Sequence, residues 1–110
     1  MSTRTDNITT AIEQLASAGG SLGALGEAAL ICQRKSEDYN GGSVSRDAYY
    51  PFGLKSYAQM IHTKSLRLVS LCQQGSDKPN FESARDTCID LINYASFCAD
   101  WLERNEKESK

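Results

Sequence analysis

The chain has 110 residues and a formal net charge of −2. This length predicts one domain with a modest core, and the charge excludes a strong basic field that would hold a nucleic-acid backbone. No apolar run approaches the ~20 residues that cross a bilayer, and residues 1–8 lack the apolar core of a signal peptide. We therefore expect a cytoplasmic protein with neither membrane attachment nor strong nucleic-acid binding.

In the N-terminal third of the chain, the sequence pattern predicts a flexible tail over 1–8, a short helix over 10–18 and a second helix over 21–36. A capping-box pattern, TAIE, opens the short helix, and the glycine pair in GGS interrupts the helical pattern before the second. In the second helix, Gly23 and Gly26 leave a narrow surface that suits close helix packing.

A long connection over 37–53 follows, with turn chemistry throughout. Loops of this length are often functional, so we expect this one to form a wall of a ligand site. Pro51 suits the first turn of the next helix, which is predicted over 52–74. The apolar stripe of that helix falls at Tyr57, Ile61, Leu68 and Cys72.

The last helix is predicted over 80–104, with Asn80 as its N-cap, and residues 105–110 are expected to fray. One apolar face runs along it and other apolar residues cover most of its remaining circumference, which is typical of a buried helix. That face comprises Ala84, Cys88, Leu91, Ala95, Cys98 and Leu102. In a chain of 110 residues, few other residues are available to bury a helix that is apolar on most sides. We therefore expect a homo-oligomer, most simply a dimer, with Gly23 and Gly26 allowing close approach.

Taken together, these patterns predict an all-α fold: a compact bundle of three main helices and a short N-terminal helix within a single domain over 9–104. No sustained apolar alternation or hairpin turn indicates a strand. Four cysteines lie in apolar helical patterns and none forms a C-x-x-C pair, which predicts reduced core thiols and a reducing compartment. They are Cys32, Cys72, Cys88 and Cys98.

A polar stripe in the last helix departs from this pattern. Asp86, Asp90 and Asn93 recur at helical spacing, roughly opposite the apolar face. If that side is covered, the two carboxylates require a cation, a metal or hydrogen bonds, because burying a charge alone is costly. The alternative is a solvated outer face, since carboxylates are seldom buried unpaired.

Lys64 departs from the pattern of the preceding helix in the same way, because it falls between Ile61 and Leu68 on the apolar stripe. Its long stem allows the ammonium to reach solvent. Otherwise the ammonium meets an anion, either Asp86 or Asp90 or a ligand phosphate. We expect Lys64 and these acids to lie within reach of one another, at a ligand site or directly behind it.

The order of four short segments, KSEDY, YYPFG, HTKSLRL and FESARDTCIDLINYASF, resembles a phage-rich family of small α-helical proteins, the nucleotide-modification-associated domain family. The likeness covers roughly residues 31–102. The matching positions are Lys35, Asp38 and Tyr39; Phe52 and Gly53; Lys64, Arg67 and Leu68; Glu82 and Ser83; Asp86 and Thr87; Asp90, Leu91, Asn93, Tyr94 and Ala95.

This resemblance implies nucleotides as the ligand class, bacteriophages as a source and an infected bacterial cytoplasm as the location. The helical layout is also similar to the all-α NTP pyrophosphatases, the MazG and dimeric dUTPase group, which hold Mg²⁺ with E-x-x-E and E-x-x-D motifs. This chain departs from them, because it has no E-x-x-E and its C-terminal acids recur at spacing four. The chain also departs from the nucleotide-modification-associated domain family, in which a glycine usually follows the residues that match Asp38 and Tyr39. Here that position is Asn40.

Three functions remain open. The first is a non-catalytic nucleotide binder without a cofactor, which captures a host-defence signal or a nucleotide used in DNA modification. Its ligand-binding residues are predicted to be Asp38, Tyr39, Tyr50, Phe52, Lys64, Arg67, Asp90 and Asn93. The second is a nucleotide pyrophosphohydrolase that binds Mg²⁺ through Glu82, Asp86 and Asp90. The third is a structural or protein-interaction bundle in which Lys64 and the acids are internal pairs.

Overall fold

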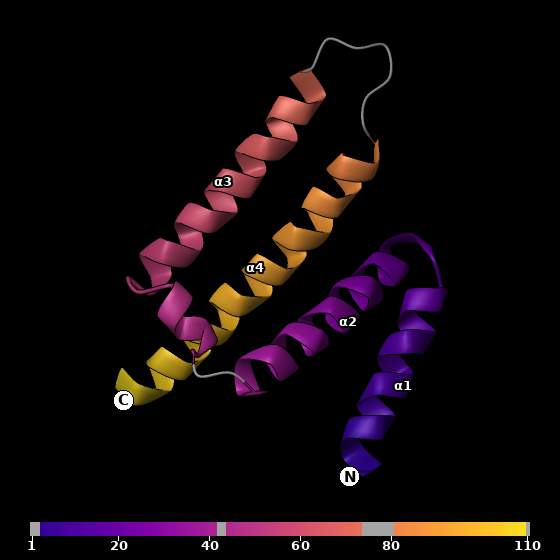
Figure 1. Cartoon of the computed structure of the whole chain (residues 1–110), viewed down its shortest axis with the longest axis horizontal. Coiled ribbons are helices and arrows are strands. Elements are labelled where there is room, and N and C mark those ends of the chain that lie inside the picture. Colours follow the sequence, from indigo (N-terminus) through magenta and orange to yellow (C-terminus); the bar gives the residue numbers. More distant parts are fainter. Residues whose placement is uncertain (1–2, 42–43, 74–80, 110) are drawn as a thin grey trace. The chain divides into compact units, whose positions relative to one another are not determined.

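The computed structural model describes residues 3–41, 44–73 and 81–109, and the side chains of 6–35, 44–73 and 83–106. Over this part of the chain the fold is all-α, which confirms the predicted class (Figure 1). Its elements are the helices α1 (Thr3–Ser17), α2 (Gly20–Gly41), α3 (Leu54–Gln73) and α4 (Phe81–Ser109), with one 3₁₀ turn, η1 (Arg46–Tyr49). None of the described helices is both long and apolar enough to cross a membrane.

Three predicted boundaries were wrong. The segment predicted as a tail is helical from Thr3, α2 continues to Gly41 into the predicted loop, and α4 runs to Ser109 through the end expected to fray. These extensions are polar, and hydrophobic periodicity cannot detect a helix turn that faces water. Pro51 precedes α3 instead of lying in its first turn.

The chain divides into two compact units, residues 1–45 and residues 46–110, and the predicted domain over 9–104 spans both. In the first unit, α1 packs against α2 through glycine. Gly26 is buried, and a Cβ atom there would overlap the backbone of Ala16. Close packing at this glycine is thus confirmed, but the neighbouring helix is α1 of the same chain, so Gly26 carries no argument for an oligomer.

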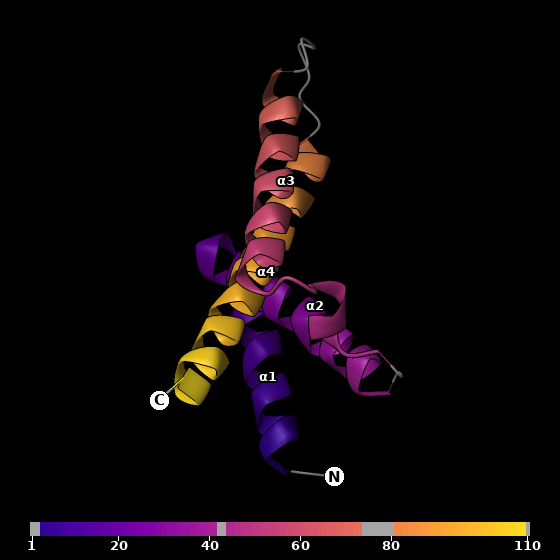
Figure 2. The ribbon, with the colours of Figure 1, turned by 90° about the vertical axis from the view of Figure 1, so that its left-hand side faces the viewer.

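In the second unit, α3 and α4 run side by side in opposite directions, as both ribbon views show (Figure 1, Figure 2). Five of the buried or half-buried positions of α3 recur at alternating steps of four and three residues, which is the spacing of a helix–helix seam. They are Tyr57, Ile61, Lys64, Leu68 and Leu71. The predicted stripe was therefore right except at its end, where Leu71 is buried and Cys72 is exposed.

On α4 the packed face is not the predicted apolar face, because Cys88, Ala95 and Leu102 are exposed. The packed face is the one that carries Asn93 and Phe97, whose exposed fractions are 4% and 3%. The prediction of core thiols was also wrong, since Cys72 and Cys88 are exposed and the other two cysteines are only half-buried. Because apolar residues surround most of α4, apolarity alone could not identify the face that packs against α3. Asn93 of the polar stripe lies on that face.

Candidate ligand pocket

The turn between η1 and α3 is built by local hydrogen bonds. The N–H of Tyr50 donates to the carbonyl of Asp47, and the N–H of Gly53 donates to the carbonyl of Tyr50, each at 3.0 Å. The N–H of Phe52 donates to Ser56 Oγ at 2.9 Å, which satisfies a backbone donor that precedes the first turn of α3. The segment between η1 and α3 thus has a defined conformation that presents its side chains.

Gly53 is required in this turn for two reasons. Its φ of +59° lies in the left-handed region, which side chains disfavour. A Cβ atom at Gly53 would also overlap the indole ring of Trp101 on α4. The turn therefore rests directly on α4, and Trp101 marks the point of contact.

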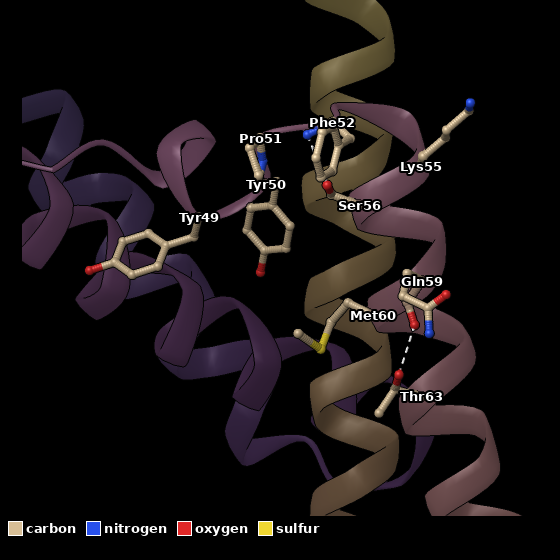
Figure 3. A pocket seen from close by; sticks show the side chains of 9 residues that line it. All are labelled: Tyr49, Tyr50, Pro51, Phe52, Lys55, Ser56, Gln59, Met60 and Thr63. Atoms are coloured by element: carbon tan, nitrogen blue, oxygen red, sulfur yellow. Dashed lines mark hydrogen bonds between the residues drawn. The ribbon is translucent and has the colours of Figure 1, made fainter.

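A pocket of about 360 Å³ opens beside this turn. It is lined by Tyr49, Tyr50, Pro51, Phe52, Lys55, Ser56, Gln59, Met60 and Thr63, which we call the aromatic pocket (Figure 3). Its volume lies within the range of small-molecule sites, about 300–1,000 Å³. Tyr49 and Phe52 expose 62% and 77% of their surface, so much of each side chain remains open to solvent beside the pocket.

The floor and rim of the aromatic pocket differ in chemistry. Tyr50 is buried and stacks on Tyr57, with ring centroids 4.1 Å apart and an angle of 15° between the rings. Lys55 is exposed at one end, and its ammonium points away from the other lining side chains (Figure 3). Gln59 and Thr63 add an amide and a hydroxyl along α3. The pocket thus offers planar apolar surface, hydrogen-bonding groups and one cation.

Behind the turn, four charged residues of η1 and α4 form what we call the ion cluster. Arg46 bonds to Asp100 at 2.6 Å, and Arg104 bonds to the same carboxylate at 3.0 Å. Arg104 also forms a bidentate pair with Asp47 at 2.8 and 3.0 Å. The guanidinium of Arg46 lies 4.5 Å from the ring centroid of Phe97, within the range of a cation–π contact.

The ion cluster shifts the proton affinity of its members. The hydrogen bond from Arg104 lowers the pKa of Asp47, although partial burial opposes this effect. The same hydrogen bond raises the pKa of Arg104. Tyr57 is fully buried and its hydroxyl donates to Asp47 at 3.2 Å; burial is the main reason that its pKa is raised. Asp47 therefore joins the cluster to the floor of the aromatic pocket.

Further along the seam, Lys64 pairs with Asp90 at 3.1 Å, and its ammonium lies 6.0 Å from the ring centroid of Tyr94. The prediction that Lys64 lies within reach of Asp90 is confirmed. The other carboxylate of that prediction, Asp86, is exposed one turn earlier on α4. Asn93, one turn after Asp90, is buried, and its Nδ2 has no hydrogen-bond partner among the described residues.

The structure separates the residues that were predicted to form one ligand site. Tyr50 and Phe52 line the aromatic pocket, whereas Lys64, Asp90 and Asn93 lie on the α3–α4 seam. Arg67 is exposed and is not a lining residue of that pocket. Asp38 and Tyr39 belong to α2, but their side chains lie outside the described residues.

The residues predicted to bind Mg²⁺ are only partly described. Asp90 is engaged with Lys64, Asp86 is exposed, and the side chain of Glu82 lies outside the described residues. Among the side chains that the structure describes, no three His, Cys, Asp or Glu residues group as metal ligands would.

Sequence reasoning missed the ion cluster and several lining residues of the pocket, among them Ser56, Gln59 and Met60. A signal for part of them was present, because the buried or ion-paired residues along one side of α4 recur at alternating steps of three and four residues. These positions are Asp90, Asn93, Phe97, Asp100 and Arg104. This spacing places Asp100 and the exposed Arg104 in line with Asp90 and Asn93 of the polar stripe.

Comparisons of the chain with protein-family models, with curated proteins and with solved structures found no match. The functional argument therefore rests on the residues and geometry of the aromatic pocket.

Proposed function

We propose that this protein binds a nucleotide, or a small molecule derived from one, in the aromatic pocket and does not alter it chemically. One observation carries the proposal: two largely exposed aromatic residues line a pocket of about 360 Å³, and a lysine lies at its rim. A nucleotide combines a planar base with an anionic phosphate, so it needs stacking surface and a cation. Stacking on aromatic side chains is worth about 1–3 kcal/mol per base.

The lining residues suggest how the ligand is held. Phe52 or Tyr49 would stack on a base and Gln59 would offer an amide to its polar edge. Lys55, whose ammonium points outward in Figure 3, would turn toward a phosphate that remains partly in water. Lys64 has a different role in this proposal. Its charge is already balanced by Asp90, so it supports the seam behind the pocket.

The resemblance to the phage nucleotide-modification-associated family agrees with this ligand class. Capture of a host-defence signalling nucleotide and retention of a nucleotide for DNA modification both require tight, non-destructive binding. The proposal covers both roles, and it places them in the cytoplasm of an infected bacterium.

The test is equilibrium binding to a panel of nucleotides with and without Mg²⁺, followed by recovery of the ligand after the protein is denatured. We expect binding without Mg²⁺ and recovery of unchanged ligand. Phe52→Ala and Lys55→Gln should each weaken binding about tenfold while leaving the melting temperature unchanged. Leu66→Ala is the matched control, since Leu66 is exposed on α3 outside the pocket. Mg²⁺-dependent product formation would favour the pyrophosphohydrolase instead.

We also propose that the chain forms a homo-oligomer. Val69 and Leu102 are 49% and 44% exposed in the second unit, and Leu22 and Leu25 are 58% and 45% exposed in the first. Light scattering should give a mass above that of one 12.1 kDa chain at micromolar concentration. The monomer mass across that range would contradict this proposal.

A further inference from the structure

We infer that the ion cluster positions the aromatic pocket: it holds η1 and the following turn on the end of α4, and so sets the ligand affinity of a pocket that it does not line. This inference rests on the proposed function for its ligand and on the geometry of the second unit for its mechanism. None of the four charged residues is a lining residue of the pocket.

The connection from cluster to pocket is continuous. Asp47 accepts the bidentate pair from Arg104 on α4 and the hydroxyl of Tyr57 on α3. Tyr57 stacks on Tyr50, which forms the floor of the pocket. The carbonyl of Asp47 also accepts the N–H of Tyr50. One carboxylate thus links both helices to the turn that presents Tyr49, Tyr50 and Phe52.

A second contact ties the same segment to α4. Arg46 bonds to Asp100 and lies over the ring of Phe97, which is buried in the seam. Charge-assisted and bidentate pairs of this kind fix geometry more strongly than neutral hydrogen bonds. No residue of the four-residue η1 is itself buried, so these polar pairs contribute to holding it in place.

The groups around Asp47 make this attachment sensitive to acid. Arg46 on η1, Tyr57 on α3 and Arg104 on α4 all favour its charged form, and Asp100 shares Arg104 with it. Since the pKa of Asp47 is lowered in the folded protein, its contribution is fully present above the ordinary pKa of about 4 and is lost as the pH falls through the lowered value. Acid should release the turn while neutral pH retains it.

The sole tryptophan of the chain, Trp101, lies against Gly53 and reports the attachment without any ligand. Asp47→Asn and Arg104→Gln at neutral pH should shift Trp101 emission to longer wavelength, with helix content by circular dichroism unchanged. The parent should show the same shift only below about pH 4. Arg104→Lys keeps the charge but loses the bidentate geometry. Its Trp101 emission at neutral pH should therefore lie between that of the parent and that of Arg104→Gln. The control is Asp86→Asn, an exposed acid on the same helix.

The second readout is the dissociation constant of AMP or another nucleotide that the parent binds. Arg104→Gln should raise it about tenfold, the scale of one lost charge-assisted pair, and Asp86→Asn should leave it unchanged. If the parent binds no nucleotide, the proposed function fails, whereas the tryptophan shift still tests the attachment. Parent-like emission in both Asp47→Asn and Arg104→Gln, or parent-like affinity despite a shifted emission, would overturn the inference.

Discussion

The two units of this chain are both helix pairs, but they are held together by opposite means. In the first, α1 and α2 approach closely because Gly26 has no side chain at the contact with Ala16. In the second, the core contains the buried aromatic rings of Tyr57 on α3 and Phe97 on α4, and Lys64 pairs with Asp90 across the seam. A glycine contact leaves no side chain available for another task, whereas the polar, aromatic seam also supports a pocket. We therefore expect added side-chain volume at the helix contact to destabilise the first unit, and removal of side-chain volume to destabilise the second.

The largest expected effect is that of Tyr57→Ala. Tyr57 is fully buried, and the change removes both its stack with Tyr50 and its hydrogen bond to Asp47. Truncation of a buried aromatic side chain costs about 3–5 kcal/mol. Denaturant unfolding followed by Trp101 fluorescence measures the loss. A loss below about 1 kcal/mol would show that Tyr57 is not the centre of the second unit's core.

Adding one methyl group at Gly26 tests the other unit. The new Cβ of Gly26→Ala would overlap backbone atoms of Ala16, which cannot rotate away, so α1 must move. Overpacking of this kind costs about 1–3 kcal/mol. Hydrogen exchange should reveal faster exchange concentrated in α1 and α2. Gly23→Ala is the comparison and should have the smaller effect, because its new Cβ would lie 3.3 Å from the carbonyl oxygen of Ala16, which needs a shift of only a few tenths of an ångström. Equal effects of the two substitutions would contradict the packing described for Gly26.

Tyr57→Phe sharpens the comparison by keeping the ring and removing only the hydroxyl. Burial raises the pKa of Tyr57, so its neutral form stabilises the fold below its ordinary pKa of about 10. That stability is lost as the pH rises through the raised value. The parent should therefore lose stability above pH 10 more steeply than Tyr57→Phe, by spectroscopic titration and melting. At neutral pH the variant should be less stable by about 1 kcal/mol.

The smallest effect is expected for the Lys64–Asp90 pair. The exposed fractions of the two side chains are 24% and 38%, so water screens their attraction. A double-mutant cycle of Lys64→Met and Asp90→Asn should give a coupling of about 0.2–1 kcal/mol. A coupling of about 3–5 kcal/mol would identify a desolvated structural pair. Lys64→Met should also retain nucleotide binding, and its complete loss would return the ligand site to the seam.

Local patterns in the sequence predicted the all-α class and the position of each helix along the chain, because hydrophobic periodicity and glycine breaks are local signals. They also predicted the Lys64–Asp90 pair, since a cation on an apolar stripe requires an anion nearby. The packed face of α4 was not predictable from apolarity, because apolar residues surround most of that helix. The polar residues Asp90 and Asn93 instead indicated which face of α4 packs against α3.

The candidate site was only half predictable, and the reason is distance along the chain. Tyr50 and Phe52 were found because aromatic residues in a long connection are unusual. The ion cluster joins residues 54 and 57 positions apart, and no local pattern reports such a pairing. The ends of the helices were missed because helix turns rich in polar residues carry no periodic apolar signal.

The central claim is that the turn before α3, and not the α3–α4 seam, receives a nucleotide. Nuclear magnetic resonance titration of the labelled protein with a nucleotide that it binds tests this most directly. The account predicts that backbone amide shifts concentrate at residues 49–63, and that Phe52→Ala moves the midpoint of the titration to about tenfold higher nucleotide concentration, while Leu66→Ala leaves it unchanged. Shifts centred on Lys64, Asp90 and Asn93, with residues 49–63 unchanged, would contradict it.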